Sequence, residues 1–188
     1  MFGENKKWVR RSVYNPECQS KNKTWTEICA YNGQTFDGKK SWSFYNINSN
    51  YNNLESARGF YIENGGTLYR INFNRNNEPY LSFTVDPDDL RMSKYDYLLQ
   101  SYGTIVLEGK TRRAIRVQRE GCEDHDYWVE GIGALRGEME EKPLSWPGVY
   151  EPLYVELLEC YEGFEKIYDI NHFSDDLYTP EHTYFPAL

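Results

Sequence analysis

The sequence predicts an all-β fold: a single antiparallel domain of about ten strands with little helix. Three observations predict it. Short segments alternate apolar with polar residues, turn signals separate these segments at close intervals, and aromatic residues, which favour strands, make up 16% of the chain. We therefore expect a partly open barrel or a two-layer sandwich whose strands are joined mostly by hairpins.

The first half of the chain contains six segments of strand character. Asp37-Gly38 is a two-residue turn signal, because both central residues of a type I′ turn need positive φ, and Asn64-Gly65-Gly66 is a second one. Five asparagines in residues 46–56 favour a loop. Strands are predicted over residues 7–14, 24–31, 40–45, 58–63, 67–73 and 80–85.

The second half continues this pattern after a short region of different character. Residues 87–100 are expected to hold one or two helical turns, and turns are expected at Glu108-Gly109 and Glu162-Gly163. Residues 1–170 are assigned to the single β-rich domain, and residues 171–188 to a C-terminal tail that is docked or flexible. Strands are predicted over residues 104–107, 113–118, 127–132, 153–160 and 164–170.

Charge and hydropathy exclude some classes of partner. The 188-residue chain has a formal net charge of −8, which disfavours nucleic acid because the phosphate backbone is also negative. The basic cluster at Lys110, Arg112, Arg113, Arg116 and Arg119 lies in a predicted strand and is interpreted as a solvated face rather than an anion site. No apolar run approaches the ~20 residues of a membrane-spanning helix, and residues 1–4 do not resemble a signal peptide.

The sequence supports neither a metal site nor a cofactor. Glu123-Asp124-His125-Asp126 is the densest group of ligand-type residues, and alternation would place Asp124 and Asp126 on one face with His125 opposite. We interpret this group as a solvated turn. A Cys-x-x-Cys pair and a phosphate-binding glycine loop are both missing from the sequence.

Candidate ligand-binding residues come from the string Trp128-Val-Glu-Gly-Ile-Gly133. Trp128 and Glu130 are expected on one face, as in sugar-binding surfaces where a ring stacks and a carboxylate accepts hydroxyls. A core tryptophan beside a buried, hydrogen-bonded glutamate is the structural alternative. Exposed aromatic platforms are a second possibility. The candidates in or beside loops are Tyr45, Tyr51, Tyr61, Trp146 and Tyr150.

The four cysteines leave the redox state open. Cys18 with Cys29 and Cys122 with Cys160 is one of three possible pairings, and free buried thiols are the alternative.

Several strings resemble a group of uncharacterised exported β-rich proteins of Bacteroides-type bacteria, many of them lipoproteins. The similarity covers most of residues 5–169: it includes Asn5-Lys-Lys-Trp8, the hairpins at Gly33–Lys39 and Gly103–Lys110, and the Trp128–Gly133 string. The resemblance implies an extracytoplasmic protein, secreted or anchored to the outer membrane by a lipid on a removed leader. It implies no catalytic residues.

The leading hypothesis for function is a non-catalytic exported or cell-envelope module that binds a glycan, a peptide or another envelope protein. A calycin-like carrier of a small apolar ligand is the first alternative, and it requires an internal cavity. A secreted hydrolase is the second. Catalysis has little support, because the chain has no Gly-x-Ser-x-Gly motif and its 29 acidic residues single out no pair.

Overall fold

The computed structural model describes residues 5–13, 23–47, 58–64, 67–72, 78–91, 97–119, 125–136 and 154–184. Its architecture confirms the predicted all-β class with little helix. Within these ranges the strands form two antiparallel sheets rather than one closed barrel. The arrangement is sandwich-like, which is one of the two predicted alternatives.

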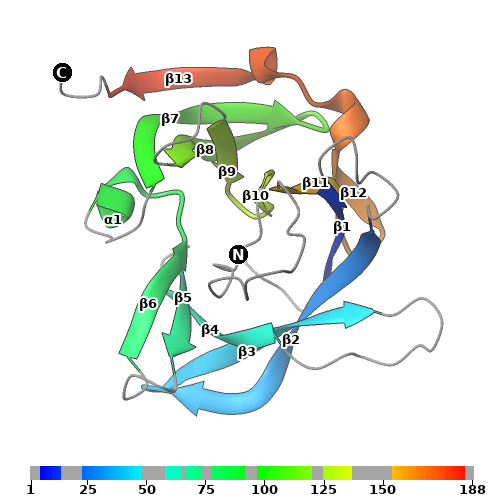
Figure 1. The fold of residues 1–188 in the computed structure, drawn as a ribbon, viewed down its shortest axis with the longest axis vertical. Coiled ribbons are helices and arrows are strands. Elements are labelled where there is room, and N and C mark those ends of the chain that lie inside the picture. The colour runs from blue at the N-terminus through cyan, green and yellow to red at the C-terminus, as the bar shows by residue number, and fades with distance from the viewer. Residues whose placement is uncertain are drawn as a thin grey trace, which may run out of the picture.

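The larger sheet has eight strands in the order β12-β11-β1-β2-β3-β4-β5-β6. It curls around the core from β12 to β6 (Figure 1). Its strands are β1 (Lys6–Val13), β2 (Thr24–Phe36), β3 (Lys39–Ile47), β4 (Arg58–Asn64), β5 (Thr67–Asn72), β6 (Glu78–Phe83), β11 (Tyr154–Glu162) and β12 (Glu165–Asp169).

The smaller sheet has five strands in the order β10-β9-β8-β7-β13 and covers the open side of the larger one (Figure 1). The sheets meet where Leu157 N donates to Leu135 O at 2.9 Å. The remaining elements are α1 (Pro87–Arg91), β7 (Tyr97–Leu107), β8 (Lys110–Arg119), β9 (His125–Val129), β10 (Gly133–Ala134), η2 (Ile170–His172), η3 (Asp175–Leu177) and β13 (Tyr178–Thr183).

Two predicted hairpin turns have the backbone conformation that their sequences require. Asp37 and Gly38 have φ of 49° and 72°, and Glu108 and Gly109 have φ of 47° and 72°. Both central residues of each turn thus have positive φ, as a type I′ turn requires, and the backbone of such a turn matches the twist of the two strands that it joins. They join β2 to β3 and β7 to β8.

The region after β6 is only partly as predicted. One helical turn forms at Pro87–Arg91, within the range expected to hold one or two turns, but the strand that follows begins at Tyr97, whereas it was expected to start at Thr104. A register shift between Leu99 and Ser101 breaks the alternation of β7 at that point. This bulge hides the first part of the strand from a period-two pattern.

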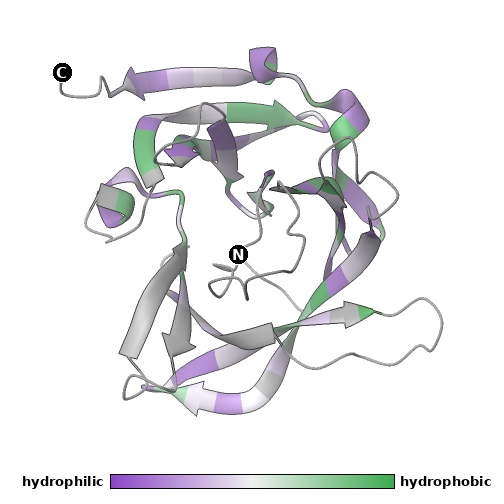
Figure 2. Cartoon of the chain, in the orientation of Figure 1, coloured by the Kyte–Doolittle hydropathy of each residue, from purple (hydrophilic) through white to green (hydrophobic). Residues whose placement is uncertain are grey.

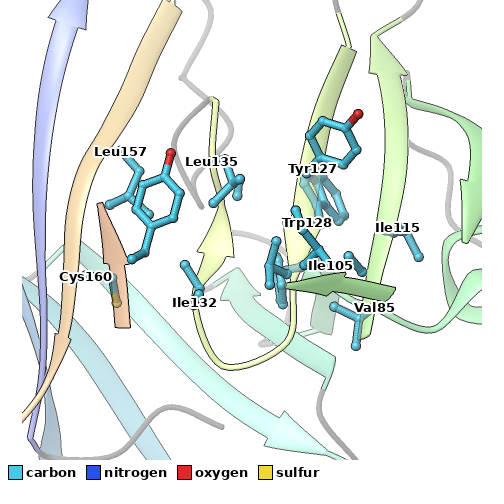
Figure 3. Packing of buried hydrophobic residues seen from close by; sticks show 14 of the residues in the cluster. Val85, Ile105, Ile115, Tyr127, Trp128, Ile132, Leu135, Leu157 and Cys160 are labelled. Atoms are coloured by element: carbon cyan, nitrogen blue, oxygen red, sulfur yellow. The ribbon is translucent and has the colours of Figure 1, made fainter. Parts of the chain in front are cut away.

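Aromatic rings fill much of the core. Trp8 packs against Phe44 with 5.5 Å between ring centroids, and Phe44 packs edge-on against Tyr61 at 5.1 Å. Ile132 and Leu135, which flank β10, lie in the space between β11 and β9 (Figure 3). Strands of both sheets contribute to one continuous core, so the two sheets are held together by burial of apolar surface.

The C-terminal segment, assigned from the sequence to a tail, contributes a strand. Tyr178–Thr183 pairs antiparallel with β7, and only Tyr178 of its six residues is buried. Figure 2 shows β13 in hydrophilic colours beside a greener β7. Its strand signal is weak, because Pro180 interrupts the tyrosine and threonines and only one residue is buried, and the strand forms where the β7 edge is available for pairing.

Gly103 allows β13 to approach β7 closely. A Cβ at this position would lie 2.1 Å from Thr179 O and 2.9 Å from the backbone nitrogen of Glu181. Both neighbours belong to the backbone of β13, so a side chain here has to displace the strand.

We expect Gly103→Ala to detach β13 and to lower the free energy of unfolding by about 1–3 kcal/mol. The measurement is hydrogen exchange at the Tyr184 amide, which donates to Gln100 O at 2.7 Å in the wild-type protein. Thr104→Ala, one residue along the same strand, is the control and should leave this amide protected. Full protection in Gly103→Ala would contradict the prediction.

Candidate functional site

The Trp128–Gly133 string ends β9 and turns through the interior toward β10. The inward-facing side chains of β1 hydrogen-bond to its backbone, which gives the string a structural role. Lys6 Nζ donates to Gly131 O, Trp8 Nε1 to Ile132 O at 2.7 Å, and Arg10 NH1 to Ala134 O at 3.4 Å. Buried carbonyl groups need such donors, and β1 supplies one at every second residue.

Trp128 lies in the core and is only 5% exposed. Its ring stacks on Phe83 of β6 with 5.5 Å between centroids and 29° between planes. The structure therefore places Trp128 as the core tryptophan of the structural alternative, and its ring is not available as a stacking platform.

Glu130 lies at the surface in an ion pair. Arg113 NH2 donates to its Oε1 at 2.8 Å, and this hydrogen bond is the main cause that lowers the pKa of Glu130. Both side chains are well exposed. Glu130 and Trp128 therefore form no common binding surface, because Trp128 is buried.

The other predicted aromatic platforms are placed only in part. Trp146, Tyr150 and Tyr51 lie outside the described residues, and Tyr45 is half-buried on β3. Tyr61 was predicted to be exposed beside a loop, and this is wrong: it is 0% exposed because its ring packs against Phe44.

Cys29 and Cys160 are buried free thiols, so neither forms a disulfide in this structure. Burial raises the pKa of each thiol to about 12. The thiolate, which is the reactive form, is therefore disfavoured at both sites. Cys18 and Cys122 lie outside the described residues.

Asp126 is buried, whereas its string was interpreted as a solvated turn. Its Oδ1 accepts hydrogen bonds from Tyr127 N at 2.7 Å and from Arg136 N at 2.6 Å. Burial is the main cause that raises its pKa to about 7, and the hydrogen bonds and Arg10 partly oppose it. Asp126 thus holds the end of the β9–β10 turn through backbone contacts.

His125 points away from Asp126, as the alternation predicts. Its Nδ1 lies 3.1 Å from Arg116 NH2 and its Nε2 lies 3.4 Å from Asp175 Oδ2. Burial and the Arg116 charge lower its pKa. Among the described residues, no group of three or more His, Cys, Asp and Glu side chains is arranged to hold a metal ion.

The basic cluster on β8 is occupied by contacts within the protein. Lys110 bonds Glu165 at 2.6 Å and Arg113 bonds Glu130, while Arg112 NH1 donates to the Glu130 carbonyl at 3.3 Å. Lys110 and Arg113 are exposed, as a solvated strand face predicts, whereas Arg112 and Arg116 are half-buried and their Nε atoms are buried. The side chain of Arg119 lies outside the described residues.

An exposed pair of rings lies on the β2–β3 hairpin and is the strongest candidate binding site. Tyr31 is directly opposite Trp42, with 6.4 Å between ring centroids and 67° between planes. Tyr31 is 37% exposed and Trp42 is half-buried. We call Tyr31 and Trp42 the β2–β3 aromatic pair.

The pair is the exposed end of a row of core rings. Trp42 lies opposite Tyr61 on β4, and directly opposite residues in antiparallel strands point to the same side. Trp42 therefore continues the face that carries Phe44 and Tyr61 into the core. The sequence predicts the shared face of Trp42 and Phe44, and both do lie against the core cluster.

A lysine completes this site. Lys40 is two residues from Trp42, and its Nζ lies 5.3 Å from the centre of the Tyr31 ring. A cation over an aromatic face is attracted by the ring quadrupole. Sequence reasoning missed Tyr31 because a register shift between Tyr31 and Thr35 decides which residue faces Trp42.

A second aromatic group lies at the β13 edge of the smaller sheet. Tyr102 of β7 faces His182 of β13, with ring centroids 5.7 Å apart and 22° between planes, and Tyr184 contacts both rings. His182 is exposed, whereas Tyr102 and Tyr184 are half-buried. We call these three residues the β7–β13 aromatic cluster.

Comparison of the chain with protein-family models, with curated protein sequences and with solved structures finds no match. In the described part of the chain, no helix combines the length and apolar character needed to span a membrane.

Proposed function

We propose that this chain is a non-catalytic module, exported or at the cell envelope, that binds a glycan through the β2–β3 aromatic pair and Lys40. The observation that carries the proposal is the exposure of Tyr31. Tyr31 is 37% exposed on a strand that also carries buried residues, and it lies opposite Trp42 and close to Lys40.

The chemistry of the three side chains suits a sugar ring. Tyrosine and tryptophan offer flat apolar faces together with a polar group. The ring can therefore contact the apolar face of a sugar while the polar group stays hydrogen-bonded to water. Lys40 is exposed and supplies up to three hydrogen-bond donors with a positive charge. That charge favours a sugar with a carboxylate, such as a uronic acid.

The structure also supports a site that is rigid before the ligand arrives. Trp42 packs against the core cluster, and the neighbouring Tyr61 is held edge-on by Phe44. A ring held by such packing loses little conformational freedom on binding, which favours affinity.

The observations favour this function over a carrier of an apolar ligand. Within the described residues, the space between the sheets is occupied by rings such as Trp8 and Phe44, and by the charged side chains of Lys6 and Arg10. A carrier needs an apolar cavity, and buried charged groups disfavour the binding of an apolar ligand because it cannot hydrogen-bond to them.

A hydrolase is also less favoured. Glycoside hydrolysis needs an acid of raised pKa that a substrate can reach, paired with a second carboxylate. Asp126 has a raised pKa but is 8% exposed and accepts backbone hydrogen bonds. Glu159 and Asp169 converge, but on Lys166, and hydrogen bonds from Lys166 lower the pKa of both.

The location outside the cytoplasm is a part of the proposal that rests on the sequence resemblance alone. The ligand that we propose is therefore a cell-surface or extracellular polysaccharide.

The test is binding to polygalacturonate and to its methyl-esterified form, measured by calorimetry. We expect Tyr31→Ala to weaken binding to both about tenfold, or ~1.4 kcal/mol, because both use the ring face. Lys40→Gln should weaken only the binding of the charged polymer.

Phe164→Ala is the matched control, because Phe164 is an aromatic residue that is fully exposed on the β11–β12 turn, away from the pair. It should bind like the wild-type protein. Failure of the wild-type protein to bind either polymer, or unchanged binding by Tyr31→Ala, would count against the proposal.

A further inference from the structure

The β7–β13 aromatic cluster lies far from the β2–β3 aromatic pair. Figure 1, drawn with the longest axis vertical, places β13 at one end of the molecule and the β2–β3 hairpin at the other. A ligand on one group of rings therefore leaves the other group accessible.

β13 contributes little to the core, so its exposed side chains are candidates for contact with a ligand. Five of its six residues are exposed, and Tyr178 alone is buried, where its hydroxyl lies 3.0 Å from Ser101 Oγ. The rest of the strand presents His182 over the ring of Tyr102. The strand thus builds a surface rather than an interior.

The edge of β13 is poorly suited to the addition of another strand. Pro180 lacks a backbone N–H, and a register shift lies between Pro180 and His182. Both features block pairing at a sheet edge. The surface is therefore available through its ring faces and side chains, which disfavours an extended peptide and favours a ligand that stacks.

The polar groups that β7 and β13 themselves present beside the cluster are uncharged or acidic, because neither strand carries a lysine or an arginine. The arginines of β8 opposite Thr104 and Ser101, Arg113 and Arg116, contact Glu130 and His125. Gln100 and Gln118 are joined by a side-chain hydrogen bond, Thr183 is exposed, and so is the carboxylate of Glu181. Amide and hydroxyl groups suit the hydroxyls of a neutral sugar. Glu181 would repel a uronate, so this surface differs in charge preference from the site that contains Lys40.

We propose that the β7–β13 aromatic cluster is a second carbohydrate site that takes a neutral glycan. The inference rests on the proposed function, because it assigns a second ligand to the same binding module. The two sites at opposite ends make the chain bivalent: one end holds an acidic polysaccharide and the other a neutral one.

The test compares two sets of variants on two sets of probes. The probes are polygalacturonate and a panel of neutral polymers: galactomannan, xyloglucan and mixed-linkage glucan. We expect the double variant His182→Ala/Tyr184→Ala to lose at least about tenfold in affinity for a neutral polymer and to keep its affinity for polygalacturonate. Tyr31→Ala should show the reverse.

Thr179→Ala is the matched control, because Thr179 is exposed on the same strand and pairs with Thr104 without a ring contact. It should bind both kinds of polymer normally. Retained hydrogen exchange protection at the backbone amide of residue 184, which donates to Gln100 O at 2.7 Å in the wild-type protein, shows that β13 of the double variant is still paired with β7.

Each outcome bears on one proposal. If the wild-type protein binds no neutral polymer, or if the double variant binds it as tightly as the wild-type protein, the second site is wrong even when polygalacturonate still binds. If the wild-type protein does not bind polygalacturonate, the proposed function is wrong instead.

Discussion

At pH 8 the variant Asp126→Asn is expected to be more stable than the wild-type protein by about 1–3 kcal/mol, or roughly 2–12 °C in Tm. Burial raises the pKa of Asp126 to about 7 from an ordinary value of 3.8. Keeping this carboxylate charged in the folded protein is therefore costly. The three-unit difference corresponds to about 4 kcal/mol, and an unpaired amide in the variant offsets part of it.

The direction of the pH dependence follows from the two pKa values. The folded chain binds the Asp126 proton more tightly than the unfolded chain, so this group contributes stability that is fully present below about pH 3.8. That contribution is lost as the pH rises through about 7. Asparagine does not titrate, and its Oδ1 can still accept from Tyr127 N and Arg136 N.

The measurement is thermal unfolding of both proteins from pH 3.5 to pH 8. Asp176→Asn is the control, because Asp176 is exposed on η3, and it should show no such trend. A stability difference between Asp126→Asn and the wild-type protein that stays constant across this range would contradict the assignment.

Arg10→Met is expected to lower the free energy of unfolding by about 3–5 kcal/mol. Arg10 is 0% exposed, and its Nε donates to Glu27 Oε2 at 2.9 Å. Removing the guanidinium leaves the Glu27 carboxylate buried without its cation. The variant also loses the contact to Ala134 O that helps to hold the β9–β10 turn.

Arg11→Met is the matched control, because it changes the same residue type on the next position of β1. Arg11 is 43% exposed in its ion pair with Glu156, so water screens its charge and replaces its contacts, and its loss should cost only about 1 kcal/mol. Urea unfolding measures both variants. The double variant Arg10→Met/Glu27→Met should recover most of the loss, and equal losses in Arg10→Met and Arg11→Met would contradict the prediction.

The strands and turns were largely predictable because their signals are local. The two-residue turns at Asp37-Gly38 and Glu108-Gly109 need residues that tolerate positive φ, and the sequence supplies them on either side of β-type segments. The single turn of α1 was also within the predicted range. Such features depend on neighbours in the chain and not on distant contacts.

The candidate site was less predictable, because register determines it. The shared face of Trp42 and Phe44 follows from alternation, but the partner of Trp42 does not. Counting back from the Asp37-Gly38 turn without a bulge would place Gly33 opposite Trp42, whereas the register shift places Tyr31 there. Trp128 failed as a ligand candidate for a related reason, since its exposure depends on whether Phe83 covers it.

The sequence by itself determined the antiparallel all-β class, most strand positions and the hairpin turns, because alternation and turn chemistry act over a few residues. Only the tertiary structure decided that Lys6 and Arg10 face inward, since their donors are needed by the buried carbonyls of the β9–β10 turn. It also decided that residues 178–183 form a strand, since the backbone of β13 can approach β7 only where Gly103 has no side chain.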